Sequence, residues 1–289
     1  MSEAVDVSDE LLTRLENGVL WLTINRADKG NAIPFYVRDA LIEAFRNAHW
    51  DVGVRAVVLT AAGDRHFRTG ADLSVPQPQR GTRPPEAPER VVGSAINMMR
   101  AGFQQLMAAI QDCEKPVIVA LNGTAAGGGS MLALAADLVI AADNAKLIQV
   151  FVRRGLVPDG GVAYLLPRIV GMHKAKELMF FGDDLSAADA ATLGIVNKIV
   201  PAAELQATAK EWAERLASGP GRRDGDVEAA KNRLIRQQLR GEIVHEQHAD
   251  VDVAVAGRSL EWGVTDVGHR CNHIRKPESS CSVLTGFAR

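Results

Sequence analysis

The chain has 289 residues, 47% of them hydrophobic and 24% charged, with a formal net charge of −2 at pH 7. This length can bury a sizeable core, in one large domain or two smaller ones. The balanced charge, with lysines and arginines scattered along the chain, argues against a nucleic-acid-binding protein. No apolar run reaches the roughly 20 residues that a membrane-spanning helix needs, and the first residues are acidic where a secretory signal is basic. The three cysteines form no CxxC pair and indicate free thiols, so we expect a cytoplasmic protein with no membrane partner.

The first 60 residues follow a strand–helix–strand pattern. Residues 11–26, "LLTRLENGVLWLTINR", predict two strands around Asn17-Gly18, a dipeptide that tolerates the positive φ of a tight hairpin turn. Residues 34–50 then predict a helix that begins after a proline, and residues 55–61, "RAVVLTA", predict another strand. Helical spacing in this segment brings together four apolar side chains: Val37, Leu41, Ala44 and Phe45.

This pattern recurs and then stops near residue 200. Residues 94–112 predict a helix, 115–123 a strand, 129–137 a short helix and 138–143 a strand. Such repeated β-β-α units indicate an α/β core. The Pro- and charge-rich segment Val75 to Arg90 predicts an exposed loop. From Pro201 onward only helical spacing is found, so we expect a core over residues 1–200 and a helical C-terminal region over 201–289.

Two glycine-containing turns follow predicted strands and could carry chemistry. Gly127, Gly128 and Gly129 lie between a buried type of strand and a helix, where backbone N–H groups can point at an anion. Tight packing of the helix on the strand explains the glycines equally well. A second turn, Gly70-Ala71 in "HFRTGADLS", could face the first, and the pair makes an oxyanion hole plausible.

At these residues the chain resembles the crotonase, or enoyl-CoA hydratase/isomerase, superfamily. The resemblance rests on "HFRTGADL", on "KPVIVALNGTAAGGGSMLALAADLVIAADNAKL" and on the segment from "GLVPDGG" to "VNKIVP". "LTINRADKGNAI" also resembles the family's N-terminal signature. The match extends in order from about Leu11 to Pro201, and Arg68 and Thr69 replace small residues that are common in the family.

The resemblance implies a fold, a substrate and an assembly. The fold is a spiral of ββα units with a helical C-terminal region, assembled into trimers or pairs of trimers. The substrates are acyl-CoA thioesters, as in fatty acid metabolism, with no metal and no cofactor beyond the CoA of the substrate. The N–H groups of Ala71 and Gly128 hold the thioester oxygen as it becomes an enolate. We expect seven further residues to contact the substrate: Gly70, Asp72, Leu73, Gly127, Met131, Phe151 and Leu156.

Two departures from the family pattern bear on the reaction. Hydratases of the family carry one glutamate just after the triple glycine and another in a "QPE"-like turn, and this pair holds and activates water. Here those positions are Met131 and Phe151, neither of which can transfer a proton, so hydration by the family's mechanism is not expected.

A single acid, Asp159, stands where several isomerases of the superfamily carry their catalytic carboxylate. These include dienoyl-CoA isomerases, some enoyl-CoA isomerases and the ring-epoxide isomerase of phenylacetyl-CoA breakdown. One carboxylate suffices to move a proton from C2 to a later carbon. Apolar walls from Phe151, Met131 and Leu156 raise its pKa, and a helix starting near Gly160 lowers it. The alternative role is that Asp159 is only the N-cap of that helix.

The sequence therefore predicts an acyl-CoA double-bond isomerase, with two alternatives. One is an enzyme that uses Asp159 as a nucleophile on an aryl-CoA, and the other is an acyl-CoA-binding homologue without activity. Asp72 has a better claim to a structural role, as a cap after Ala71. The closely spaced His269, Cys271 and His273 lack a second ligand cluster, so we expect no metal site.

Overall fold

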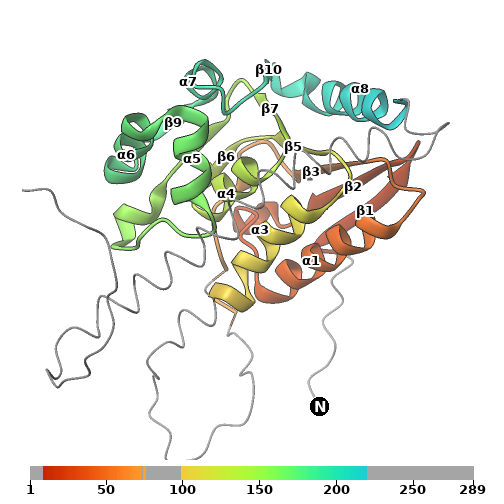
Figure 1. Ribbon diagram of the computed structural model, residues 1–289, viewed down its shortest axis with the longest axis horizontal. Helices are drawn as coiled ribbons and strands as arrows, with labels where there is room; N and C mark the ends of the chain where they lie inside the picture. Colours follow the sequence, from red (N-terminus) through yellow and green to blue (C-terminus); the bar gives the residue numbers. More distant parts are fainter. Residues whose placement is uncertain (1–8, 73, 76–98, 220–289) are drawn as a thin grey trace, which may run out of the picture. The chain divides into compact units, whose positions relative to one another are not determined.

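The computed structural model describes residues 9–72, 74–75 and 99–219 (Figure 1). All of them belong to the first of two compact units, Met1–Ile243, and the second unit, Val244–Arg289, lies outside the described residues. The predicted loop from Val75 to Arg90 lies outside them as well, except for Val75.

The chain enters the fold through the predicted hairpin. Strands β1 (Leu11–Glu16) and β2 (Val19–Ile24) pair antiparallel, with Leu15 opposite Leu20. The two residues between them, Asn17 and Gly18, have φ angles of 52° and 78°. Positive φ at both central residues is the geometry of a type I′ turn, whose twist matches that of the strands it joins.

A six-stranded sheet forms the main layer. Its order is β1-β2-β3-β5-β7-β10, and every pair after the hairpin is parallel. The remaining strands of this sheet are β3 (Ala56–Ala61), β5 (Val117–Leu121), β7 (Leu138–Ala142) and β10 (Lys198–Val200).

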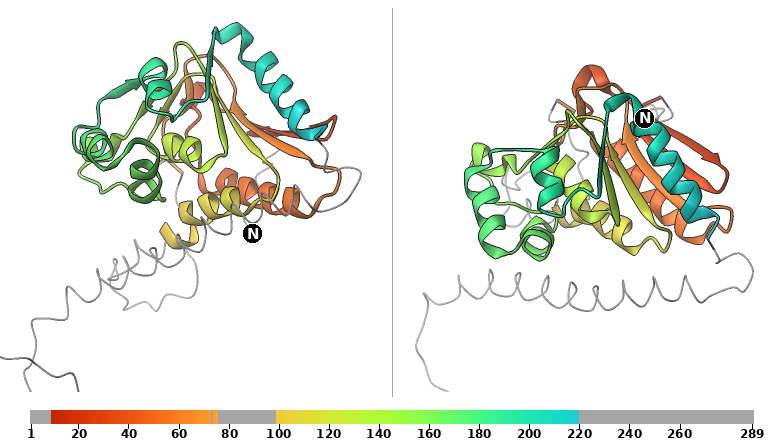
Figure 2. Two further views of the ribbon diagram at one scale, coloured as in Figure 1. Left: turned by 45° about the horizontal axis from the view of Figure 1, so that its top comes forward. Right: turned by 90° about the horizontal axis from the view of Figure 1, so that it is seen from above.

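Alternate residues of these strands enter two separate cores, because successive side chains of a strand point to opposite faces. On one face, residues such as Leu22 and Leu59 pack with helices α1 (Phe35–Trp50) and α3 (Phe103–Asp112). On the other face, residues such as Trp21 and Val58 pack with helix α8 (Leu205–Ala217). Figure 2 shows α8 and the α1–α3 pair on opposite sides of the sheet.

A second sheet of four short strands lies beside the first. Its order is β4 (His66–Arg68), β6 (Thr124–Ala126), β8 (Lys146–Ile148) and β9 (Asp184–Ser186). Its first three strands each follow a long strand of the main sheet, and helix α4 (Gly128–Ala135) comes directly after β6. The repeated long strand, short strand and helix confirm the predicted α/β class and its ββα units.

Shorter elements complete the described part. They are η1 (Ala27–Lys29), η2 (Val150–Arg154), α5 (Val162–Val170), α6 (Met172–Phe181), α7 (Ala187–Thr192) and η3 (Ala202–Glu204). Among the described helices, none combines the length and the apolar character needed to cross a bilayer.

The predicted helical region after residue 200 is described only at its start. Helix α8 matches the first predicted helix of that region and packs against the main sheet through Leu205, Ala209 and Ala213. Residues 220–289 lie outside the described part, so the boundary between a core over 1–200 and a helical region over 201–289 stays a prediction.

Candidate active site

The first glycine turn joins β6 to α4. Gly127 has φ 50° and ψ −111°, a conformation that side chains other than glycine rarely adopt, and α4 begins at Gly128. As the first residue of a helix, Gly128 has no carbonyl four residues back within the helix to accept its N–H. Its N–H also has no other acceptor among the described residues. An unbonded N–H at the positive end of a helix is a donor available to a ligand anion.

Close packing accounts for part of this glycine cluster. A Cβ on Gly129 would lie 2.3 Å from the carbonyl oxygen of Arg68, which belongs to the neighbouring strand β4. A Cβ on Gly128 would lie 2.5 Å from Nη1 of the same arginine. Close packing of helix and strand therefore explains Gly129, while the Gly128 N–H is unbonded and its role toward an anion stays a prediction.

The second turn follows β4, which runs parallel to β6, so both turns emerge at the same edge of this small sheet. Gly70 has φ 131°, and the backbone of Ile33 bonds the residues on either side of Ala71. The Ile33 N–H donates to the Gly70 carbonyl (3.0 Å), and the Asp72 N–H donates to the Ile33 carbonyl (3.1 Å). The Ala71 N–H has no acceptor within the described part of the chain.

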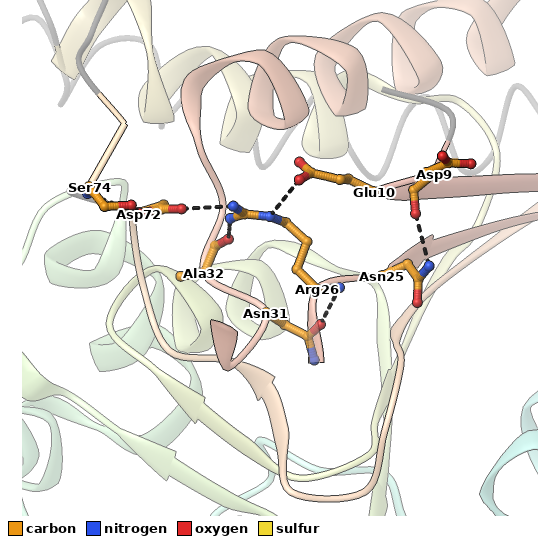
Figure 3. Close-up of polar contacts among 8 residues, drawn as sticks. All are labelled: Asp9, Glu10, Asn25, Arg26, Asn31, Ala32, Asp72 and Ser74. Atoms are coloured by element: carbon orange, nitrogen blue, oxygen red, sulfur yellow. Dashed lines mark hydrogen bonds and ion pairs between the residues drawn. The ribbon is translucent and has the colours of Figure 1, made fainter. Parts of the chain in front are cut away.

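A buried ion pair fixes the Ala71 turn in place (Figure 3). Nη2 of Arg26 lies 2.8 Å from Oδ2 of Asp72, and both side chains are buried. The other carboxylate oxygen of Asp72 accepts hydrogen bonds from the Ser74 N–H (2.9 Å) and hydroxyl (2.5 Å). Arg26 also donates to the Ala32 carbonyl and lies 3.2 Å from Glu10. Asp72 thus has the structural role that the sequence favoured, and substrate contact by its side chain stays a prediction.

The pKa of Asp72 is lowered to about 2, mainly by the hydrogen bond from the Ser74 hydroxyl; burial raises it as the second largest effect, and the bond from Arg26 lowers it further. A carboxylate whose pKa is lower in the folded state stabilises the fold at pH values above the ordinary aspartate pKa. This stabilisation is lost as the pH falls through the pKa of the folded state. The stabilisation by Asp72 is therefore complete above a pH of about 4 and is lost as the pH falls toward about 2.

Replacing Asp72 by asparagine is expected to lower the free energy of unfolding by about 3 to 5 kcal/mol, because Arg26 stays buried with only Glu10 nearby. Urea denaturation at pH 7 measures this loss. The matched control is Asp184→Asn, since Asp184 pairs with Arg153 on the surface and is 42% exposed. That control should cost at most about 1 kcal/mol. Equal losses in the two variants would show that the Arg26–Asp72 pair adds nothing beyond a surface ion pair.

Asp159 lies in the loop between η2 and α5, and its side chain is partly buried. Burial raises its pKa, while a hydrogen bond from its own backbone N–H lowers it to a smaller extent. No ion pair or side-chain partner accompanies this carboxylate in the described part of the chain. A carboxylate with a raised pKa and no charged partner is suited to accept and return a proton.

Met131 and Phe151 connect this loop to the Gly127–Gly128 turn. Met131 lies on α4, and its Cε is so close to Gly160 that a Cβ on that glycine would lie 1.9 Å away. The ring of Phe151 lies 4.0 Å from the position of a Cβ on Gly127. Both side chains are buried. Met131 thus packs against the Asp159 loop and Phe151 against the glycine turn, and contact of either side chain with the substrate stays a prediction.

Two expectations about Asp159 need correction. Leu156 was expected to form an apolar wall, but its side chain is 61% exposed. The alternative role as a helix N-cap is wrong for the side chain, since the N-cap of α5 is Gly161 and no side chain caps it. Asp159 contributes only its backbone carbonyl, which accepts from the Val162 N–H at 3.1 Å. Leu73 lies outside the described residues.

Arg68 is a site residue whose environment the sequence did not reveal. Its side chain is fully buried at the end of β4, and its Nη1 donates to the Gly128 carbonyl at 2.5 Å. The guanidinium stacks on Phe103 of α3, 4.6 Å from the ring centroid. The available signal was a large charged residue at a position where small residues are common in the resembled family.

The described residues contain no group of three or more metal-ligating side chains. The segment with His269, Cys271 and His273 lies outside the described part, so the structure does not test it.

Comparison with known proteins agrees with this geometry. Residues 14–253 match the family model described as "Enoyl-CoA hydratase/isomerase". A 1,2-epoxyphenylacetyl-CoA isomerase of Escherichia coli is 33% identical over 87% of this chain and 92% of its own. A probable enoyl-CoA hydratase of Rhodobacter capsulatus is 36% identical over 71% of this chain and 74% of its own. The crystal structure of an enoyl-CoA hydratase/isomerase from Pseudoalteromonas atlantica superposes with a TM-score of 0.70 at 33% identity, covering 87% of this chain and 92% of that one. The two unbonded turn amides, the ββα spiral and these matches together show that the chain belongs to the enoyl-CoA hydratase/isomerase family.

Proposed function

We propose that this protein is an acyl-CoA double-bond isomerase that works through a thioester enolate with Asp159 as its single acid and base. The carboxylate removes a proton from C2 of the acyl group, and the charge moves to the thioester oxygen. The N–H groups of Ala71 and Gly128 stabilise that oxygen, and Asp159 returns the proton further along the chain. The observation that carries the proposal is a partly buried carboxylate of raised pKa in a loop that packs on α4, the helix whose first N–H is unbonded.

The side chains around Asp159 favour isomerisation over hydration. A hydratase has to hold a water molecule and activate it, which needs groups that accept and donate protons. Met131 and Phe151 can do neither, and both are buried against the loop and the glycine turn.

We expect the purified protein to hydrate crotonyl-CoA negligibly, because Met131 and Phe151 stand where hydratases of the family carry the two glutamates that activate water. Loss of the enoyl absorbance on addition of enzyme measures hydration directly. A kcat of about 10 s⁻¹ or more, typical of a working enzyme, would refute this expectation.

The isomerase activity itself can be tested without knowing the natural acyl group. A panel of 3-enoyl-, dienoyl- and aryl-CoA esters is incubated with the enzyme in deuterated water, and mass spectrometry follows double-bond migration and deuterium at C2. The proposal requires migration for at least one ester and no covalent adduct. An acyl adduct on Asp159 after a single turnover would instead indicate a nucleophile acting on an aryl-CoA. Tight binding without exchange or migration would indicate a protein that only binds acyl-CoA.

The expected assembly, a homotrimer or a pair of trimers, is part of the proposal. Its support is a group of exposed apolar side chains around η2 and α6: Val152, Val157, Met172, Phe180 and Phe181. Val152 lies close to Gly182 at the end of α6, so members of this group from both elements are neighbours. Exposed apolar area of this kind favours burial against another copy of the chain. We also propose a cytoplasmic role in fatty acid metabolism, with the CoA of the substrate as the only cofactor.

A further inference from the structure

The buried guanidinium of Arg68 lacks an anionic partner. Its side chain is fully buried, yet no ion pair to it is found among the described residues. Its Nε and Nη2 atoms have no hydrogen-bond partner, so one bond, from Nη1 to the Gly128 carbonyl, serves the whole group. The face of Phe103 offers only partial compensation. Removing a charge from water without a partner is costly, so this arrangement reduces the stability of the ligand-free fold.

The position of this charge relative to the glycine turn suggests what it serves. Nη1 would lie 2.5 Å from a Cβ on Gly128, and Nη2 would lie 2.7 Å from it. The guanidinium is therefore packed against the residue whose N–H is unbonded at the N-terminus of α4. Both the helix end and the arginine place positive potential at this N–H, in an interior where water screens little.

We infer that Arg68 is a positioning residue for the oxyanion hole, whose buried positive charge acts through the Gly128 turn to stabilise the enolate formed during the reaction. The inference rests on the proposed function, because it needs an enolate at this site. The enolate oxygen supplies the negative charge that Arg68 lacks in the ligand-free protein. The positive charge of Arg68 stabilises a neutral thioester little and the negatively charged enolate strongly. Stabilising the intermediate more than the bound substrate accelerates the chemical step.

Enolate formation can be measured separately from isomerisation. Acetoacetyl-CoA is a β-keto thioester with an acidic α-carbon, and its enolate has its own ultraviolet absorbance. Titration of the full-length protein with this ester gives the enolate fraction of the bound ligand at a fixed pH. Binding of butyryl-CoA, a saturated thioester whose α-carbon is far less acidic, reports ground-state affinity in parallel.

The decisive variant is Arg68→Met, which keeps an unbranched side chain and removes the charge. We expect the ratio of enolate to neutral ligand to fall roughly tenfold to hundredfold, with the Kd for butyryl-CoA changed less than about threefold. The melting temperature should stay the same or rise, because replacing an unpaired buried charge by an apolar group is often stabilising. Arg68→Lys should restore part of the enolate signal because it keeps the charge.

The control is Arg46→Met, the same replacement at an exposed arginine of α1 that bonds Gln105. It should change none of these measurements. If Arg68→Met does not fold, the neutral Arg68→Gln variant is measured in its place.

Three results would overturn the inference, each in a recognisable way. A neutral variant that melts earlier but forms enolate like the wild type would make Arg68 a structural residue. Weaker binding of succinyl-CoA alone, with enolate formation unchanged, would make it a receptor for a carboxylate on the acyl group. If the wild-type protein bound acetoacetyl-CoA without enolising it, both the inference about Arg68 and the proposed enolate mechanism would be refuted.

Discussion

Replacing Asp159 by asparagine is expected to reduce isomerisation and C2 proton exchange by roughly 100-fold to 10,000-fold. Asparagine keeps the size of the side chain and removes the only carboxylate that the structure places in this loop. The stability of the fold should be unchanged or slightly higher, because Asp159 is partly desolvated and burial raises its pKa. Rates on a substrate that the wild type converts, measured beside a thermal melt, give both quantities.

Two further measurements make the Asp159 result specific. Asp159→Ala should not lower the free energy of unfolding by the roughly 1 kcal/mol that loss of a side-chain N-cap costs, since Gly161 caps α5.

In the wild type, the reaction rate should fall toward acid pH with a midpoint above the ordinary aspartate pKa, because Asp159 no longer acts as a base once it binds a proton. Asp183→Asn changes an exposed aspartate and serves as the control. Full activity in a well-folded Asp159→Asn protein would exclude the catalytic role.

Replacing Gly128 by proline is expected to slow the same reactions at least ~100-fold, because proline has no N–H to donate to the thioester oxygen. Gly128 is the first residue of α4, a helix position that tolerates proline well, so we expect the variant to fold. Circular dichroism checks the fold, and α-proton exchange in deuterated water measures the rate.

The structure shows that this variant needs a matched control. Any Cβ on Gly128 crowds the Arg68 guanidinium, so Gly128→Ala should also lose some activity. Alanine keeps the N–H, so the rate difference between Gly128→Pro and Gly128→Ala measures the effect of the N–H donor alone. We expect the proline variant to be at least tenfold slower than the alanine variant. Ala71→Pro should lower the rate by a similar factor, while Ala71→Gly should not, because the Ala71 N–H bonds nothing else in the described part. Equal rates in all four variants would show that the two turns do not hold the oxygen.

Local patterns in the sequence predicted most of the fold near the site. Asn17-Gly18 predicted the hairpin because few dipeptides accept two positive φ angles in succession. The helical spacing of Val37, Leu41 and Phe45 predicted α1, and these side chains do pack under the sheet. Each of these features depends on residues that are close together in the chain, where the physical rules are strongest.

Features that depend on distant parts of the chain were harder to predict. Leu156 is exposed just after Gly155, the C-cap of η2, and no apolar pattern around it indicates this. The Arg26–Asp72 pair joins residues 46 positions apart. The isolation of Arg68 became visible only when β4, α3 and α4 were packed together, since an arginine within a loop-like motif is usually solvated.

Helix α8 has a consequence for synthesis on the ribosome. It covers the outer face of the sheet, where Val19, Trp21, Val58 and Ile118 are buried against its Leu205, Ala209 and Ala213. Strand β5, which carries Ile118, ends at Leu121 and so leaves the ribosome well before α8, which begins at Leu205. At about 5 to 20 residues per second, the growing chain therefore displays an uncovered apolar sheet face for roughly 4 to 17 seconds. Throughout that interval the nascent protein presents the kind of surface that molecular chaperones bind.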